Sequence, residues 1–245
     1  MVLGKMNVVE TKGIVLSSLK YGDTSLIVRC FTEKSGLKSF IAKGVFTKKK
    51  RNVALYFPLN EIDLIYSPKA NDQQLVFLKS AQTAYYFQSL HIHPIKSAIV
   101  FFLAELLNLV LKAEEHNNDL FQFIKQSLIL FDEKNSDFAD FHLVFLLNLT
   151  HFLGFYPSLE NENSTLFDLE NGCFTEVNSS INMLNTLETE LFKKLLNSQF
   201  DLTTKNQFNQ QQRNILLDIL VRYFQVHTNN FKKPNSLQVL HELFS

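Results

Sequence analysis

The residues best suited to chemistry in this chain form a basic run at positions 34–51. The run holds seven lysine or arginine residues and no acidic one: Lys34, Lys38, Lys43, Lys48, Lys49, Lys50 and Arg51. Such side chains neutralise phosphates and release counterions, which gives a sequence-independent, salt-sensitive affinity for nucleic acid. Phe46 and Tyr56 flank the densest part and offer rings on which bases could stack. The run therefore indicates a nucleic-acid site, while a solvated loop without a partner would carry the same charges.

Enzyme and metal-site motifs are absent from the sequence. There is no Gly-rich phosphate loop, no Gly-x-Ser-x-Gly elbow and no His-Glu-x-x-His motif. Cys30 and Cys173 are too isolated to nominate as nucleophiles, and the pair His91 and His93 has no third ligand nearby. We therefore expect a protein that is not an enzyme, with no catalytic residue, no metal and no cofactor.

Charge is divided unevenly along the chain. Residues 1–80 carry 13 lysine and arginine residues against six acidic ones, a net charge of +7, and residues 81–245 carry 11 against 18, a net charge of −7. This asymmetry predicts two domains, the first of which meets a polyanion. Two cysteines fit a reducing compartment, and no signal peptide or membrane span is apparent. We expect a cytoplasmic protein that does not bind membranes.

The elements that must position the basic run read as short strands. Apolar and β-branched segments occur at 13–16, 25–31, 37–45, 61–66 and 74–79, with turn signals at 21–23 and 33–36. Five short strands in 80 residues predict a closed five-stranded barrel of the OB type over residues 1–80. One face of such a barrel binds oligonucleotides.

The period of the apolar residues becomes helical after about residue 83. Helices are predicted at 95–110, 119–132, 137–155, 187–198, 207–227 and 236–244. Residues 158–182 are polar and predict an irregular segment. The fold class is therefore α+β: an N-terminal OB-type barrel, then an all-helical domain over residues 81–245.

An ordered series of segments resembles the RecO family of bacterial DNA repair proteins. The series comprises KGIVL at 12–16, YGDTSLIV at 21–28, FTEKSG at 31–36 and AKGV at 42–45, followed by the basic run where that family keeps one. At the far end, RYF at 222–224 and KKPNSLQVL at 232–240 resemble the family's closing helical region. The likeness is specific over roughly the first 65 residues and diffuse through the middle.

The resemblance implies an N-terminal OB domain, an all-helical C-terminal domain and a role as a recombination mediator. Members bind single- and double-stranded DNA, anneal complementary strands, and work with RecR and with the C-terminal tail of single-strand-binding protein to help load RecA. It also implies a place at the nucleoid in the cytoplasm. The candidate DNA-binding residues are then Arg29, Phe46 and the seven basic residues of the run.

Two departures from the family pattern matter. Many members have an arginine just after the AKGV stretch, where this chain has Phe46. Many also hold zinc with four cysteines in the helical domain, whereas residues 157–177 here contain Cys173 alone. Because structural zinc needs four protein ligands, we expect no zinc. Phe167 and Gly172 are expected to keep the packing of that loop.

The resemblance also implies a receptor for an acidic tail in the helical domain. Such a receptor needs cations beside an apolar pocket, and the candidates are Arg213, Arg222, Lys232 and Lys233. Arg213 and Arg222 are nine residues apart, so they face opposite sides of one helix. These two are the preferred candidates, because arginine binds carboxylates bidentately beside apolar side chains. Pairing with a neighbouring acid at the surface explains each of them slightly better.

Two other functions fit the residues. A basic OB barrel also suits an RNA-binding protein, because phosphate contacts and stacking serve both nucleic acids. The chain could instead be a protein–protein scaffold in which the basic loop is idle.

Overall fold

The computed structural model describes residues 8–47, 52–68, 75–111, 116–178, 180–199, 201 and 203–243. The chain divides into two compact units, Met1–Ile129 and Leu130–Ser245. A five-stranded barrel followed by a helical region was predicted, and this prediction is confirmed. The expected domain boundary at residue 80 stays a prediction.

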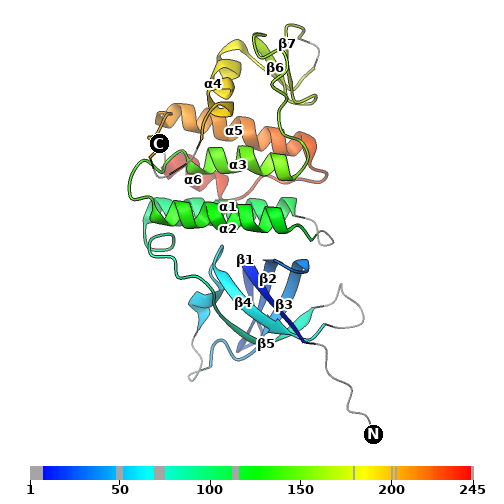
Figure 1. Ribbon diagram of the computed structural model, residues 1–245, viewed down its shortest axis with the longest axis vertical. Helices are drawn as coiled ribbons and strands as arrows, with labels where there is room; N and C mark the ends of the chain where they lie inside the picture. The colour runs from blue at the N-terminus through cyan, green and yellow to red at the C-terminus, as the bar shows by residue number, and fades with distance from the viewer. Residues whose placement is uncertain are drawn as a thin grey trace. The chain divides into compact units, whose positions relative to one another are not determined.

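Five strands form the barrel of the first unit, in the order β1-β2-β3-β5-β4 (Figure 1). They are β1 (Val9–Tyr21), β2 (Ser25–Thr32), β3 (Gly36–Ala42), β4 (Glu61–Tyr66) and β5 (Val76–Thr83), with a short 3-10 helix, η1 (Val53–Tyr56), between β3 and β4. Four of the neighbouring pairs are antiparallel. β3 and β5 are parallel, and in the described part of the chain they pair at two positions only.

A β-bulge between Val15 and Ser17 changes which residues of β1 face the barrel core. Before the bulge, Val15 is paired with Cys30 in the barrel core. After it, Ser17 is paired with Arg29, and Ser18 with the core residue Val28. Because side chains alternate along a strand, the odd-numbered residues of β1 face inward before the bulge and outward after it.

Helices α1 (Pro94–Val110) and α2 (Asn118–Glu133) follow the barrel. One row of outward-facing residues runs across four strands where α2 meets the barrel: Leu37, Phe31, Ile14 and Glu61. One turn apart on α2, Phe121 packs on Phe31 with ring centroids 6.1 Å apart, and Lys125 lies 3.0 Å from the Glu61 carboxylate. This row is buried, so α2 covers part of the outer barrel wall.

The second unit contains helices α3 (Phe141–Phe152), α4 (Thr186–Leu196), α5 (Gln210–His227) and α6 (Leu237–Leu243). Helix α3 begins four residues later than predicted. Asp140, just before it, accepts hydrogen bonds from the backbone N–H groups of Gln207 and Phe208, which lead into α5. In the part of the chain that the structure describes, no helix is long and apolar enough to cross a membrane.

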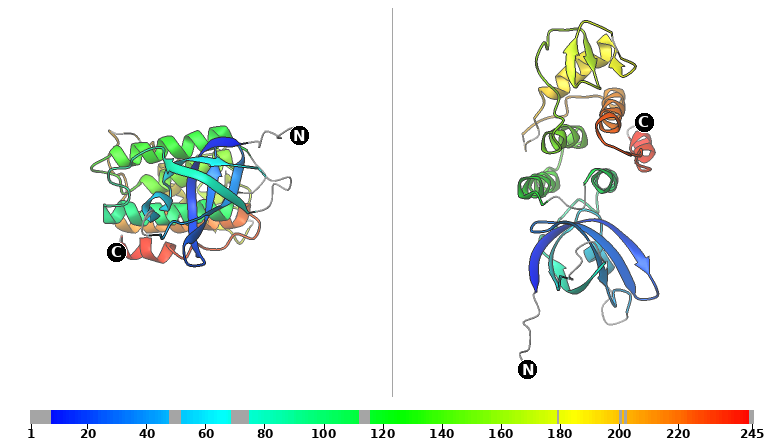
Figure 2. Two further views of the ribbon diagram at one scale, coloured as in Figure 1. Left: turned by 90° about the horizontal axis from the view of Figure 1, so that it is seen from below. Right: turned by 90° about the vertical axis from the view of Figure 1, so that its right-hand side faces the viewer.

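The segment predicted to be irregular contains short strands, so that prediction was incomplete. Strands β6 (Leu166–Asp168), β7 (Cys173–Thr175) and β8 (Met183–Leu184) form a small sheet in the order β7-β6-β8, seen beside α4 in Figure 2 (right). Phe167 packs against Phe174 and Phe192, at centroid distances of 4.9 and 5.0 Å. This aromatic cluster holds the sheet against α4.

The β6–β7 turn closes over Tyr223 of α5. Gly172 there has a φ of 63°, and a Cβ atom on it would lie 2.7 Å from the Tyr223 hydroxyl. That hydroxyl donates to the carbonyl of Phe155 at 2.8 Å. Asp168 organises the same turn by accepting from the backbone N–H groups of Glu170 and Asn171. The expectation that Phe167 and Gly172 serve packing in this loop is confirmed.

Candidate nucleic-acid interface

The outer wall of the barrel that α2 leaves uncovered carries an unusual set of side chains. Register places Leu19 opposite Ile27, Tyr21 opposite Ser25, and Ile41 opposite both Ile27 and Phe77. These residues point away from the core because their neighbours Leu26, Val28, Phe40 and Val76 point into it. We call the surface formed by Leu19, Tyr21, Ile27, Arg29, Ile41 and Phe77 the open face.

Large apolar side chains are exposed on the open face. Leu19 is 68% exposed, Tyr21 53% and Phe77 43%. A strand residue of this size normally packs under another element, as Phe31 does farther along β2. Exposed aromatic rings on a barrel wall suit the stacking of unpaired bases, which is tolerant of sequence because every base has a π face.

Two cations of the predicted set lie with these rings. The Lys43 ammonium lies 4.1 Å from the centroid of the Phe77 ring. Arg29 stands on β2, where partial burial lowers the pKa of its guanidinium. Arginine remains charged near neutral pH despite such a shift. The open face therefore combines rings for bases with positive charge for phosphates.

Phe46 lies at the end of the barrel that carries the β1–β2 turn. Its backbone N–H donates to the carbonyl of Thr24 at 3.2 Å, and the Lys20 ammonium lies 5.8 Å from its ring centroid. The ring is 36% exposed. Phe46 and Lys20 thus lie at the end of the barrel beside the open face and not on it, because Lys20 is paired with the core residue Leu26.

The structure separates the remaining predicted residues. Lys34 lies in the β2–β3 turn at the opposite end of β2, where its ammonium donates to the carbonyl of Glu10 at 2.7 Å. Lys38 is paired with Cys30 near that end and is half-buried. Lys48, Lys49, Lys50 and Arg51 lie outside the described residues. Their assignment to DNA stays a prediction.

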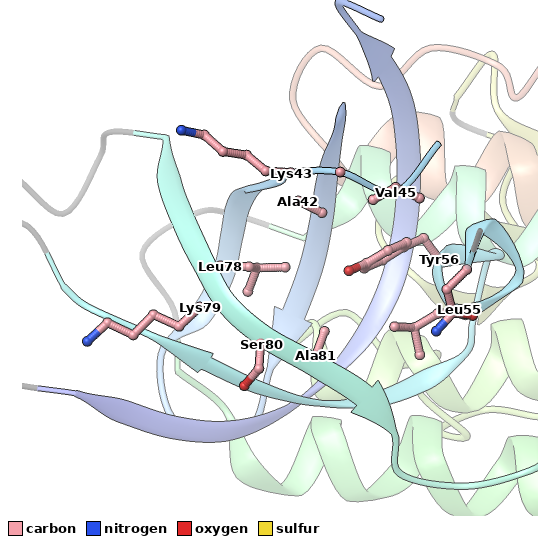
Figure 3. Close-up of a pocket in the computed structure, with 11 residues that line it drawn as sticks. Ala42, Lys43, Val45, Leu55, Tyr56, Leu78, Lys79, Ser80 and Ala81 are labelled. Atoms are coloured by element: carbon pink, nitrogen blue, oxygen red, sulfur yellow. The ribbon is translucent and has the colours of Figure 1, made fainter. Parts of the chain in front are cut away.

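A groove opens between the end of β3 and β5 (Figure 3). Its volume is about 320 Å³, and its walls come from residues 42–45, Asn52, Leu55, Tyr56 and residues 78–81. Tyr56 is only 6% exposed and belongs to the barrel core, so the expectation that its ring is free to stack on bases was wrong. Burial raises the pKa of Tyr56 to about 12, which keeps the hydroxyl protonated.

Sequence reasoning missed Leu19, Tyr21 and Phe77. Tyr21 was assigned to a turn, and strict alternation from Val15 would have put Leu19 inside the barrel. The available signal was the sequence Leu19-Lys20-Tyr21, in which a basic residue is interleaved with large apolar ones.

The predicted partner-binding residues of the second unit occupy different settings. The Arg213 guanidinium, 14% exposed, donates to the carbonyl of Phe208 and to the Asp140 carboxylate at 3.3 Å. Arg222 is half-buried, and Lys232 and Lys233 are exposed. Arg213 therefore joins α5 to α3, while the two lysines remain open to a partner.

The described residues contain no group of three histidine, cysteine or acidic side chains arranged to hold a metal ion.

Comparison with known proteins places these features in a family. The family models "Recombination protein O N terminal" and "Recombination protein O C terminal" match residues 6–87 and 93–236. The chain is 39% identical to the DNA repair protein RecO of Flavobacterium psychrophilum, over 97% of this chain and 99% of the relative. It is 36% identical to the RecO of Bacteroides fragilis (96% and 98% covered) and 27% identical to that of Porphyromonas gingivalis (97% and 99%).

Proposed function

The chain belongs to the recombination protein O family, and on that premise we propose that it is a DNA repair protein that binds DNA without catalysing a reaction. We propose further that it is a recombination mediator, which anneals complementary strands and helps load RecA onto single strands coated by single-strand-binding protein. RecR and the C-terminal tail of single-strand-binding protein are its proposed protein partners.

The open face is the observation that carries the proposal. Exposed Tyr21 and Phe77 offer stacking surfaces, and Lys43 and Arg29 supply charge beside them. Stacking and phosphate contacts hold a strand without reading its sequence. A mediator that acts on any damaged site needs such binding. Neutralised phosphates also reduce the repulsion between two complementary strands, which favours annealing.

The binding test removes the two rings. Tyr21→Ala and Phe77→Ala should each weaken binding of a labelled oligothymidine, since stacking contributes about 1–3 kcal/mol per base. Tyr86→Ala is the matched control, because Tyr86 is 74% exposed but lies outside the open face. Equal affinity of all three variants and the wild type would refute the open face as the DNA site.

The mediator role needs a separate test. Annealing of complementary strands coated with single-strand-binding protein should be accelerated by the wild type and not by the Tyr21→Ala/Phe77→Ala variant. A wild type that binds DNA but leaves this annealing rate unchanged would refute the mediator role. A preference for RNA over single-stranded DNA of equal length would favour the alternative of an RNA-binding protein.

We place the receptor for the acidic tail near Lys232 and Lys233, with Arg222 as a further candidate. Both lysines are exposed, whereas Arg213 is already bound to Asp140 and Phe208. A labelled tail peptide should bind the full chain and lose affinity with Lys232→Ala/Lys233→Ala. Wild-type affinity in that variant would place the receptor elsewhere.

A further inference from the structure

The groove described above exists because the barrel is poorly closed on one side. β3 and β5 pair at Phe40–Val76 and Ile41–Phe77, after which β3 ends at Ala42 while β5 continues to Thr83. From Leu78 onward, β5 pairs with β4 alone among the described residues. The groove lies beside this unpaired edge and reaches down to side chains of the barrel core.

The interior of the groove is apolar but has polar groups at defined points. Leu55, Leu78 and Ala81 form apolar walls, and Tyr56 projects its hydroxyl into the space toward Leu78 (Figure 3). Most of the Tyr56 side chain is buried, but its hydroxyl oxygen is open to the groove and makes no hydrogen bond with the described residues. Asn52 adds a further polar group to the lining, whereas the Ser80 side chain points away from Tyr56 (Figure 3). A hydroxyl that faces an open groove without a protein partner can donate to, or accept from, a ligand that enters the groove.

The margin of the groove carries positive charge. Lys43 and Lys79 stand on opposite walls, and their side chains project outward from the groove (Figure 3). None of the described residues that line the groove is acidic. The ligand suited to this arrangement has a flat, largely apolar part that carries hydrogen-bonding atoms, and an anionic part that stays outside.

We propose that the groove takes one unstacked base of a bound DNA strand, with the adjoining phosphates against Lys43 and Lys79. The inference rests on the proposed DNA binding and adds a subsite to it. Lys43 already links the two surfaces, because it lines the groove and lies over Phe77 of the open face. A strand that crosses the open face thus reaches the groove at Lys43.

The polar groups of the groove suit any base. A hydroxyl group donates or accepts as its partner requires, so the Tyr56 hydroxyl can meet the edge of a purine or a pyrimidine. Removing a base from its stack costs a few kcal/mol in a duplex and least in a single strand. The subsite therefore favours single strands over duplexes without selecting their sequence.

An extended acidic peptide is the competing occupant, because the free edge of β5 could pair with an added strand. A peptide strand needs a row of backbone partners and makes no use of the Tyr56 hydroxyl within the groove. The apolar depth beside that hydroxyl favours a base, and the peptide becomes one outcome of the test.

The first experiment uses thymidine 5′-monophosphate and amide NMR spectra of the full chain. The nucleotide should shift the signals of Gly44, Ser80 and Ala81 and leave those of Leu19 and Tyr21 unchanged. Tyr56→Phe should weaken this binding about 2- to 10-fold, the worth of one hydrogen bond. Ala81→Leu, which fills the groove, should abolish it.

The second experiment separates the subsite from DNA binding as such. An oligothymidine with one 2-aminopurine reports unstacking by its emission. The wild type should change that emission on binding, and Tyr56→Phe and Ala81→Leu should reduce the change while the strand still binds. Phe77→Ala is the control that weakens strand binding but keeps capture of the mononucleotide.

The outcomes are distinguishable. If the oligothymidine does not bind the wild type at all, the proposed function fails. If it binds, but the mononucleotide shifts no groove signal and both groove variants give the wild-type emission, the subsite is refuted. Shifts of the groove signals by an acidic peptide and not by the nucleotide would likewise overturn it.

Discussion

The replacement of Gly172 by alanine is expected to destabilise the second unit through two separate effects. The φ of 63° at this position costs an L-residue about 1–2 kcal/mol. The new Cβ would also stand 2.7 Å from the Tyr223 hydroxyl, which must then move away from the Phe155 carbonyl. Leaving that carbonyl without a partner costs about 1–3 kcal/mol. Gly172→Ala should therefore lower the free energy of unfolding by about 2–5 kcal/mol.

A double-mutant cycle with Tyr223→Phe separates the two effects. Without the hydroxyl, the nearest atom to the new Cβ is the ring carbon at 3.7 Å, which is an ordinary contact. In that background Gly172→Ala should cost only the backbone term of about 1–2 kcal/mol. The measurement is urea unfolding followed by the amide signals of Phe174 and Leu184, which report on the small sheet. Equal costs in both backgrounds would show that the hydroxyl contact plays no part.

Four further predictions address the metal, the basic run, the domain boundary and pH. Elemental analysis should find no stoichiometric zinc, a chelator should leave the Tm unchanged, and Cys173→Ser should fold; a Tm lowered by the chelator would contradict this. Replacing Lys48, Lys49, Lys50 and Arg51 by glutamate should weaken the binding of single-stranded DNA. It should also flatten the slope of the log binding constant against the log salt concentration, which for the wild type is roughly −2 to −3.5 if about three to five phosphates each contribute about −0.7. A chain ending at residue 80 should aggregate, whereas one ending at residue 133 should fold. The reason is that α2 buries Phe31 and its neighbours, and each buried side chain contributes about 1.5–3 kcal/mol to stability. A folded, monomeric 1–80 fragment seen by NMR would contradict this. Burial and the charge of Arg213 lower the pKa of His142 to about 3 from 6.5, so its contribution to stability is complete above pH 6.5 and is lost as the pH falls below it. His142→Phe should flatten the dependence of the urea midpoint on pH between about 6.5 and 3, and an unchanged profile would exclude this role.

The barrel and the long helices were predictable because their patterns are local. Period-two segments and the turn signal at Gly22, whose φ is 61°, locate the strands, and the 3.6-residue period locates the helices. The small sheet was not predictable in this way. Its strands are two or three residues long, which is too short for any period to show. Phe167 and Gly172 were placed correctly only through the resemblance to a family.

The candidate site was predictable in composition but not in arrangement. Arg29, Lys43 and Phe46 lie on or beside the open face, whereas Lys34 lies at the other end of β2 because the strand carries it there. Sequence proximity gives no information on such separation. The burial of Tyr56 depends on the fold of η1 against the barrel core, a long-range contact that no local pattern encodes.

The bulge in β1 lets one strand place apolar side chains on both walls of the barrel. Before it Val15 faces the core, and after it Leu19 and Tyr21 face outward, although strict alternation from Val15 would put them inside. Pairing with β2 fixes these faces, because Leu19 lies opposite Ile27. A deletion of Leu16 would therefore remove the bulge and still leave Leu19 and Tyr21 on the outer wall. Loss of the bulge residue is expected to spare the open face, whereas substitutions of Leu19 and Tyr21 weaken it by degrees.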